Sequence, residues 1–342
     1  MRRLLLAGRL DLRVEEVAPP EPGAGQVVVR VAAAGVCGSD LHGYRGTNDR
    51  RRPGTVMGHE VSGTVADVGP GVDPGWRGRP VALNPVLGCE RCPACRSGEP
   101  QRCPDKALIG CVPHLPGGFA ELVVGPVIAL VPWDGPAPLA WGAFAEPLAV
   151  GLHAARRLVP PQGPVLVQRP VLAERSVLVV GSGPVALAAA WSAQRDGARV
   201  SVTETDERRG SLVRSLGLAT QRQDALTPDD RYDAVVDCVA TEESLGLALR
   251  QVRVAGAVVV VGLGAATAPL PVELLVQRDL TLQGSAQYSR RSFADAVAWL
   301  GSGDLDVGPL LGTPEPLTAA PELFRTWDDG PSRPLRTLLT PG

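Results

Sequence analysis

The sequence has no surplus of charge of either sign and no long apolar run. Lys and Arg number 34 against 36 Asp and Glu, a formal net charge of −2. No basic excess is therefore available to neutralise a nucleic-acid backbone, and we expect no such partner. No apolar stretch is long enough to span a membrane. The apolar run near the start ends at Gly8, too short for a secretory signal, so we expect a cytoplasmic protein.

The sequence does contain enough apolar material for two domains. Hydrophobic residues make up 44% of the 342 residues and charged residues 20%, which excludes a disordered chain. The cysteines number seven, an odd total that does not suggest a disulfide framework. Four of them fall close together, and clustered cysteines in a cytosolic chain point to a bound metal.

The two halves of the chain follow different patterns. In the first half, short β-branched runs such as Gln26–Val31 and Val61–Val68 are separated by Gly and Pro, which predicts a β-rich domain. From about residue 175, apolar runs alternate with helix-length segments, the pattern of a parallel sheet covered on both faces. The predicted strands of this second region are Ser176–Val180, Arg199–Thr203, Ala234–Val239, Ala257–Gly262 and Leu280–Gly284.

Four cysteines form the strongest local signal. They are Cys89, Cys92, Cys95 and Cys103. Structural zinc takes four thiolates in a tetrahedron, and two-residue gaps let a tight loop aim several sulfurs at one point. A redox Cys-x-x-Cys is the alternative, but such motifs normally open a helix. A closed four-sulfur site keeps no position open for substrate, so we expect it to stabilise the fold.

A second set of possible metal ligands begins in the segment that follows Gly35. Cys37 offers a thiolate, His59 an imidazole and Glu60 a carboxylate, a mixed set typical of a zinc that keeps one position open. Glu146 lies in an apolar stretch, where a carboxylate needs a partner or a metal. It is the other candidate for the third ligand. Ser39 and His42 are placed next to the Cys37 ligand, where a hydroxyl and an imidazole can relay a proton.

A glycine-rich turn follows the first predicted strand of the second region. In Gly181-Ser182-Gly183-Pro184-Val185-Ala186 the first glycine allows a tight turn, the second lets a pyrophosphate approach, and Ala186 permits close packing. The start of the following helix supplies amide donors for phosphate. Glu204 ends the next strand, where a carboxylate bonds both ribose hydroxyls of NAD and repels a 2′-phosphate. Arg208 and Arg209 could accept that phosphate, so NADP remains the alternative to NAD.

Together these motifs resemble the zinc-containing medium-chain dehydrogenase/reductase family. The segments Cys37–His42, Gly58–Glu60, Gly117–Glu121 and Glu146–Leu148 occur in family order with the cysteine quartet and the glycine turn. The Glu-Pro-Leu-Ala-Val stretch is most similar to the sorbitol, butanediol and threonine dehydrogenase branch. The resemblance implies an α/β protein with a GroES-like catalytic domain formed by residues 1–150 and 287–342. A Rossmann domain of residues 151–286 is inserted, and the active site lies between the two.

The resemblance also implies roles for individual residues. Cys37, His59 and either Glu60 or Glu146 would bind the catalytic zinc, giving two zinc ions per chain with the quartet. Ser39 and His42 match the proton-relay positions. Residues that would line the dinucleotide are Gly181, Ser182, Gly183, Pro184, Val185, Glu204, Arg209, Leu263, Gly264 and Ser285. Cys238 falls near the adenine side, although a packed thiol is its simpler interpretation.

Two segments depart from the family pattern. The proline-rich segment 163–174 is longer than the usual link into the first Rossmann strand. The loop Thr47–Pro53 carries three consecutive arginines just ahead of His59. We expect this loop to be a solvated surface loop, with recognition of an anionic substrate as the alternative.

The function predicted from these observations is reversible oxidation of a secondary alcohol to a ketone with NAD. The branch resemblance favours a polyol, vicinal diol, amino alcohol or cyclitol, and with 4% aromatic residues the pocket need not be large and hydrophobic. Two alternatives are a zinc-independent NADPH quinone or enone reductase and a nucleotide-binding protein without catalysis. By resemblance we expect a homodimer or homotetramer.

Overall fold

The computed structural model describes residues 1–47, 50–158, 172–329 and 335–342. The chain divides into two compact units, one formed by Met1–Glu146 with Ser289–Gly342 and the other by Pro147–Tyr288. The expectation of an unusually long proline-rich link falls on residues that lie largely outside the described ones. Within the described parts of the chain, no helix is both long and apolar enough to cross a membrane.

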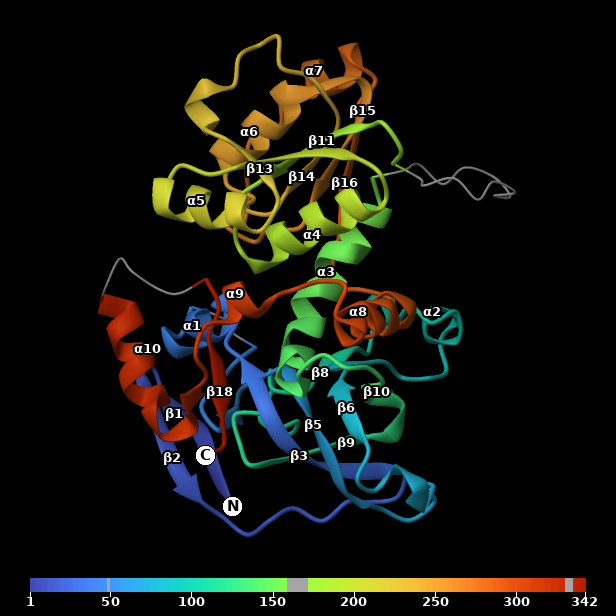
Figure 1. The fold of residues 1–342 in the computed structure, drawn as a ribbon, viewed down its shortest axis with the longest axis vertical. Coiled ribbons are helices and arrows are strands. Elements are labelled where there is room, and N and C mark those ends of the chain that lie inside the picture. The colour runs from blue at the N-terminus through green and yellow to red at the C-terminus, as the bar shows by residue number, and fades with distance from the viewer. Residues whose placement is uncertain (48–49, 159–171, 330–334) are drawn as a thin grey trace. The chain divides into compact units, whose positions relative to one another are not determined.

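The first unit is built mainly from antiparallel strands (Figure 1). Its largest sheet has the order β10-β6-β5-β3-β18-β17, with β9 also paired to β3. The strands of this sheet are β3 (Gln26–Gly35), β5 (Glu60–Val68), β6 (Pro80–Leu83), β9 (Leu122–Pro126), β10 (Leu130–Pro132), β17 (Glu315–Pro316) and β18 (Leu338–Thr340). Smaller sheets join β1 (Arg2–Gly8) with β2 (Asp11–Glu16) and β4 (Thr55–Val56), and β7 (Val86–Leu87) with β8 (Ala107–Leu108).

The C-terminal tail completes this unit. Strand β18 pairs antiparallel with β3, so that Leu338 faces Gly35 across the ladder. Phe324 is fully buried and meets the ring of Phe119 edge-on at 6.3 Å between centroids. These contacts place the last residues of the chain in the core of the first domain. The helices of this part are α1 (Gly38–Tyr44), α2 (Pro93–Arg96), α8 (Arg290–Ser302), α9 (Gly308–Leu311) and α10 (Ala320–Asp329), and α3 (Ala145–Arg156) begins in this unit and ends in the other.

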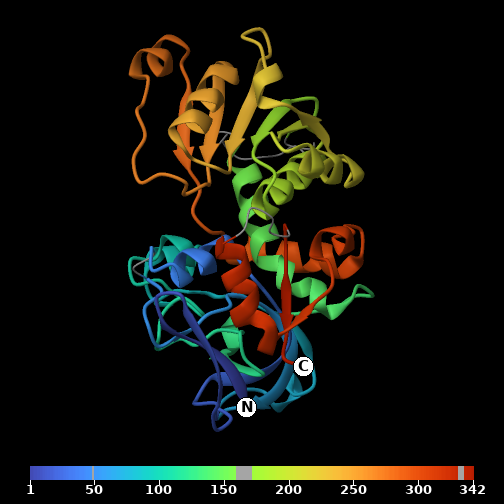
Figure 2. The same cartoon turned by 90° about the vertical axis from the view of Figure 1, so that its left-hand side faces the viewer.

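The second unit is a six-stranded parallel sheet in the order β13-β12-β11-β14-β15-β16. The order reverses direction between β11 and β14, which makes the sheet doubly wound. Helices cover both of its faces (Figure 2). The strands are β11 (Ser176–Val180), β12 (Arg199–Thr203), β13 (Ala219–Gln221), β14 (Tyr232–Asp237), β15 (Val252–Val260) and β16 (Thr281–Gly284), and the helices are α4 (Pro184–Arg195), α5 (Glu207–Ser215), α6 (Glu242–Gln251) and α7 (Val272–Gln277).

The apolar runs located five of these six strands; β13, whose residues are exposed or half-buried, was not predicted. Strands β11 and β12 have the predicted bounds. Every residue of β11 after the first is buried, as its continuous apolar run predicts. Strand β15 begins at Val252, five residues before the predicted start at Ala257. Arg253 and Gly256 interrupt the apolar run in this part of the strand, and Arg253, Val254 and Ala255 are exposed.

Candidate active site

The strand ladder of the first unit brings the mixed metal-ligand types together. Strand β5 begins at Glu60, which faces Gly35 at the end of β3. Cys37 follows two residues later and caps the N-terminus of α1. As a result, one ligand atom each from Cys37, His59 and Glu60 lies within 4.8 Å of the others. Glu146 is 8% exposed at the start of α3 and does not belong to this group of ligand atoms.

The chemistry of this group fits a metal ion. Thiolate is the form of cysteine that binds metals. Burial opposes ionisation of Cys37, but the hydrogen bond and charge of His59 outweigh it and lower the pKa of the thiol to about 6. Glu60 Oε1 is buried and takes part in no hydrogen bond within the described residues. A cation between these three side chains would satisfy that oxygen.

Asp40 and Arg51 both lie against the Nδ1 side of the His59 ring, with Arg51 Nη2 3.3 Å from that nitrogen. The side chain of Asp40 is fully buried, and its Oδ1 lies 3.5 Å from Nδ1 of His59. Its Oδ2 accepts a hydrogen bond from the backbone N–H of Cys37 at 3.0 Å. The other ring nitrogen of His59, Nε2, lies 3.9 Å from Glu60 Oε1. A carboxylate on one ring nitrogen of a ligating histidine sets its tautomer and aims the other at the metal.

The expectation of a solvated arginine loop is wrong for Arg51. This side chain is 6% exposed, although Arg50 and Arg52 on either side are exposed. Its Nε donates to Asp40 Oδ1 at 3.1 Å. Its Nη2 donates to Ser39 Oγ at 2.9 Å. Because a buried guanidinium needs a counter-charge, the carboxylate of Asp40 holds Arg51 inside the site.

The predicted relay residues differ in exposure. Ser39 is partly buried and accepts the hydrogen bond from Arg51. His42 is exposed, and its Nδ1 lies 3.3 Å from the hydroxyl oxygen of Thr47. Both belong to α1, which starts at the Cys37 cap. The short helix therefore carries a partly buried hydroxyl and a solvent-facing imidazole directly after the ligand cysteine.

Arg336, in the C-terminal tail, is a further member of this site that local sequence patterns do not reveal. It forms a buried ion pair with Glu60 and donates from Nη1 to the carbonyl of Val36 at 3.1 Å. A Cβ atom at Gly35 would lie 2.2 Å from Glu60 Oε2, so glycine is required beside this pair. The buried charges of the site are thus balanced by two arginines, Arg51 and Arg336.

The four cysteines of the quartet also converge. Their sulfur atoms all lie within 4.8 Å of one another, and none of them forms a disulfide. The backbone N–H of Cys89 donates to the sulfur of Cys103 at 3.4 Å. That of Cys95 donates to the sulfur of Cys92 at 3.5 Å. Amide donors favour ionised thiols, so the loop is suited to four metal-bound thiolates.

In the second unit, the glycine turn joins β11 to α4. Gly181 has a φ of +98°, a conformation that side chains disfavour, and Gly183 caps the helix. Ser182 donates a hydrogen bond to the carboxylate of Glu204. That carboxylate also accepts from the N–H of Thr205 at 2.7 Å. Hydrogen bonds therefore connect the glycine turn with Glu204 at the carboxyl ends of β11 and β12. This is the edge at which doubly wound sheets bind ligands.

The other predicted cofactor residues lie at the same edge of the sheet. Pro184 and Val185 open α4, Cys238 follows β14, Leu263 and Gly264 follow β15, and Ser285 follows β16. Leu263 is 95% exposed, whereas Ser285 is buried and its hydroxyl has no hydrogen-bond partner in the described residues. Burial, with the charge of Asp237, raises the pKa of the Cys238 thiol. Arg209 is exposed on α5, as is Arg208.

Comparisons with known proteins agree with this arrangement. The chain matches the family models for the alcohol dehydrogenase GroES-like domain over residues 23–135 and for zinc-binding dehydrogenase over 184–302. An L-idonate 5-dehydrogenase of Vitis vinifera is 32% identical over 90% of this chain and 85% of its own. A sorbitol dehydrogenase of Arabidopsis thaliana is 30% identical over the same shares. An alcohol dehydrogenase of Thermus sp. superposes over 99% of both chains with a TM-score of 0.87 at 28% identity.

The chain belongs to the zinc-containing medium-chain dehydrogenase/reductase family, in its polyol dehydrogenase branch. The predicted fold class, a GroES-like domain with a Rossmann domain, is confirmed by the family models and by structures of the same fold. The dehydrogenase is thus an enzyme that acts on an alcohol. Of the residues that build its site, Asp40, Arg51 and Arg336 were not predicted as functional. Asp40 had a local signal, because it follows the helix-capping Cys37 by three residues. Arg51 stood in the arginine run, but nothing in the run distinguished it from its neighbours.

Proposed function

We propose that the protein oxidises a secondary alcohol to a ketone with zinc and NAD. The observation that carries this proposal is the convergence of Cys37, His59 and Glu60 within 4.8 Å. One imidazole nitrogen, one carboxylate oxygen and one thiolate are a ligand set that suits a zinc ion with a position left open for substrate. When bound, zinc supplies Lewis acidity toward the alcohol oxygen and the dinucleotide accepts the hydride.

Glu60 is our choice for the third ligand over Glu146. Its Oε1 lies 3.9 Å from Nε2 of His59, and Arg336 holds the other oxygen. Glu146 contributes no ligand atom to the group, although it is buried at the start of α3. The four cysteines Cys89, Cys92, Cys95 and Cys103 would hold a second zinc ion with a structural role.

Side chains of helix α1 would carry away the proton that the substrate alcohol loses. Ser39 Oγ accepts a hydrogen bond from Arg51, so the hydroxyl hydrogen of Ser39 is free to be donated onward. The Ser39 oxygen can then take the proton that the substrate loses. His42 is exposed and can pass a proton to water. The positive charge of Arg51 stabilises negative charge that develops on the Ser39 oxygen.

NAD is favoured over NADP because of Glu204. The carboxylate accepts from Ser182 and two backbone N–H groups, so it is held in place at the end of β12. A fixed negative charge there bonds ribose hydroxyls and repels a 2′-phosphate. Arg208 and Arg209 are exposed and would have to move to offset that repulsion.

The substrate class we propose is a polyhydroxylated alcohol. Relatives that share about 30% of the sequence bear the names L-idonate 5-dehydrogenase and sorbitol dehydrogenase. One of these substrates is a sugar acid and the other a neutral polyol. The charge of Arg51 is neutralised by its buried ion pair with Asp40, so it does not favour one of these two substrates over the other.

Zinc content separates this proposal from its alternatives. We expect two zinc ions per chain in the purified protein, one after Cys37→Ala and one after Glu60→Gln, with Glu146→Gln retaining two. Turnover of secondary alcohols with NAD should be lost with Cys37→Ala while the protein stays folded. One zinc in both the parent and Cys37→Ala would contradict the catalytic metal and favour a zinc-independent reductase. Tight NADH binding without turnover of any alcohol would favour a non-catalytic role.

We also propose that the protein forms a homodimer or homotetramer. Several large apolar side chains of the second unit are exposed, among them Val254, Val272 and Val276. Exposed apolar residues close to an edge strand, here β16, suit pairing with a second copy. Light scattering should give at least twice the chain mass, and a monomer at working concentration would contradict the proposal.

A further inference from the structure

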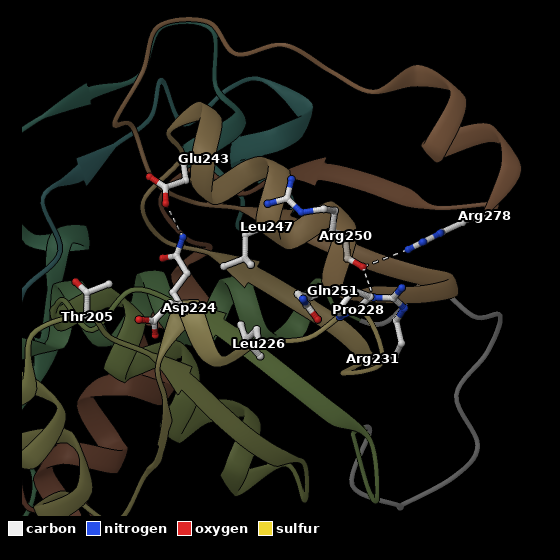
Figure 3. Close-up of a pocket in the computed structure, with 11 residues that line it drawn as sticks. Thr205, Asp224, Leu226, Pro228, Arg231, Glu243, Leu247, Arg250, Gln251 and Arg278 are labelled. Carbon is white, nitrogen blue, oxygen red and sulfur yellow. Dashed lines mark hydrogen bonds between the residues drawn. The ribbon is translucent and has the colours of Figure 1, made fainter.

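The cavity drawn in Figure 3 belongs to the proposed dinucleotide site. Thr205, which lines it, directly follows Glu204 just after the end of β12. Two arginines of its wall, Arg231 and Arg278, already donate hydrogen bonds to the carbonyl of Arg250. The cavity therefore provides no separate binding site. The first unit, by contrast, contains aromatic contacts between α10 and the segments that carry the candidate zinc ligands.

Helix α1 is short, and its direction depends on what packs against it. It has seven residues, from Gly38 to Tyr44, and isolated helices of this length are marginal in water. Cys37 caps the start of this helix, and Asp40 in its first turn lies 3.5 Å from the ring of His59. A tilt of α1 would therefore move Cys37 and Asp40 relative to His59.

The far end of α1 is anchored to α10. The Tyr44 ring is buried and meets the ring of Phe324 edge-on, with 5.6 Å between the centroids. The next residue, Arg45, ends the helix and forms an ion pair with Asp328. Phe324 and Asp328 are one turn apart on α10, so one helix makes both contacts. Figure 1 shows α10 beside α1.

The same Phe324 ring also reaches the segment Gly58–Glu60 by way of Phe119. The two phenylalanine rings meet edge-on at 6.3 Å between centroids. Phe119 in turn lies against Gly58, because a Cβ atom on that glycine would be 2.6 Å from the backbone nitrogen of Phe119. The N–H of Phe119 donates to the carbonyl of Met57 at 3.0 Å. Through one further ring each, Phe324 thus connects the two segments that carry the candidate ligands.

The position of Phe324 is fixed by the core of the first unit. Ala320, Phe324 and Trp327 are buried on one face of α10, whereas Glu322 and Arg325 are exposed. Protein interiors are close-packed, so a smaller side chain in place of a buried ring leaves a void that its neighbours fill by moving. The neighbours in this case are the rings that contact α1 and the segment before the histidine ligand.

We propose that Phe324 is a positioning residue for the candidate catalytic zinc site. It sets the spacing between α1, which begins directly after Cys37, and the segment that carries His59. The ion pair of Asp328 with Arg45 supports it at the end of the same helix. The proposal rests on the proposed function, since it concerns the zinc ion that these ligands would hold. Helix α10 would thereby control the zinc affinity of this site and leave the cysteine quartet unaffected.

Removal of zinc by a chelator tests the proposal. The full-length protein and its variants are dialysed against graded concentrations of dipicolinate, and the zinc left per chain is measured beside a melting curve. We expect Phe324→Leu to release one zinc ion at a dipicolinate concentration about tenfold lower than the parent protein does, the range for residues that orient metal ligands. The second zinc ion should be released at the parental concentration.

Phe293→Leu is the matched control. Phe293 is 1% exposed and lies on α8 in the same unit, so the substitution removes an equally buried ring. This variant should release the zinc ion held by Cys37 at the parental concentration. Equal early release from both variants would mean that general loosening of the core frees the metal, which contradicts a specific role of Phe324.

The Cys37→Ala background identifies the ion that is released. This variant should hold only the zinc ion of the quartet, and adding Phe324→Leu should not change the dipicolinate concentration that removes it. A lower concentration in the double variant would place the effect of Phe324 on the quartet and overturn the proposal.

Asp328→Asn keeps the aromatic core and covers the case in which Phe324→Leu does not fold. It should lower the releasing concentration about twofold to fivefold, since a partly exposed ion pair contributes less than a buried ring. With Phe324→Leu unfolded, an unshifted concentration in Asp328→Asn would overturn the proposal.

The zinc content of the parent protein separates this inference from the proposed function. One zinc ion in both the parent and Cys37→Ala would contradict the proposed function, and with it the zinc that Phe324 would position. Two zinc ions in the parent, with unshifted release in a folded Phe324→Leu, would contradict the role of Phe324 alone.

Discussion

Arg51 Nη2 donates to Ser39 Oγ at 2.9 Å, and the same guanidinium is anchored through Nε to the buried Asp40. This relationship connects the expected proton-relay hydroxyl to the carboxylate that orients His59. Arg51, from the loop that precedes Gly58–Glu60, is therefore part of the candidate active site. Its role is to position Ser39 and His59 and to stabilise negative charge near them.

Replacing Arg51 should therefore slow the reaction more than it weakens substrate binding. We expect Arg51→Met to lower kcat about tenfold to a hundredfold, the range for loss of a charge-assisted hydrogen bond, and to shift the pH profile of kcat upward. The upward shift follows because a positive charge near Ser39 favours loss of its proton. Arg51→Lys should restore part of the rate, since lysine keeps the charge but not the planar fork.

Arg52→Met is the matched control for this prediction. Arg52 is the next residue in the loop and is exposed. Steady-state kinetics with an unchanged kcat in this variant would show that the effect belongs to the buried position. If Arg51→Met changed KM alone, with the pH profile unmoved, Arg51 would act in substrate binding and not on the relay.

The candidate metal ligands could be predicted from the sequence, whereas the buried arginines that contact them or their neighbours could not. Cys37, His59 and Glu60 belong to residue types whose chemistry is recognisable from spacing alone. Arg51 stands among three consecutive arginines, and nothing local separates the buried one from its two exposed neighbours. Arg336 lies far along the chain and reaches Glu60 only because β18 pairs with β3. Such long-range pairing sets burial, and burial decides which charges act in the site.

The Rossmann unit was the more predictable part for a physical reason. A parallel sheet covered on both faces requires continuous apolar strands, as in β11, and these are visible in the sequence. The glycine turn adds a backbone constraint at Gly181, with its positive φ.

Glu204 should control the choice of cofactor. We expect Glu204→Ala to raise the KM for NAD about tenfold, because the ribose hydroxyls lose their acceptor. The KM for NADP should fall at the same time, since the repelling charge is gone and Arg208 and Arg209 are close in sequence. Kinetics with both cofactors measure the change, and an unaltered preference would show that Glu204 does not contact the ribose. Glu207→Ala, an exposed carboxylate at the first residue of α5, is the control.

The ion pair between Arg2 and Glu121 should make stability depend on pH. The side-chain and backbone hydrogen bonds of Arg2 lower the pKa of Glu121 from its ordinary value of 4.5. A carboxyl group with a lowered pKa in the folded state stabilises the fold above the unfolded-state value, and this is lost as the pH falls through the folded one. Both side chains are about one-third exposed, so the contribution is at most about 1 kcal/mol.

Glu121→Gln should accordingly lower the free energy of unfolding by up to about 1 kcal/mol at pH 7 and 5.5. The difference from the parent protein should shrink below pH 4.5, where Glu121 in the unfolded chain is protonated. Urea unfolding at several pH values measures it. Glu21→Gln, an exposed carboxylate in the same unit, should show no such pH dependence. A constant difference at every pH would mean that packing of the side chain, and not its charge, accounts for the loss.

Gly88 should be essential for the cysteine quartet. A Cβ atom at this position would lie 2.4 Å from Sγ of Cys95 and 3.2 Å from Cβ of Pro100. Since Cys95 Sγ is one of the four converging sulfurs, the methyl group can be accommodated only by moving a metal ligand. We expect Gly88→Ala to lose the structural zinc and to lower the melting temperature. Metal analysis should show one zinc ion fewer than in the parent protein.

Gly98→Ala separates this effect from ordinary backbone strain. Gly98 also lies in the cysteine loop and has a φ of +78°, but a Cβ atom there would meet no other atom within 4 Å. Its substitution should cost about 1 kcal/mol through the left-handed backbone and leave the zinc content unchanged. If both variants kept their zinc, the quartet would tolerate displacement of Cys95. If both lost it, the backbone of the whole loop, and not contact with that sulfur, would control metal binding.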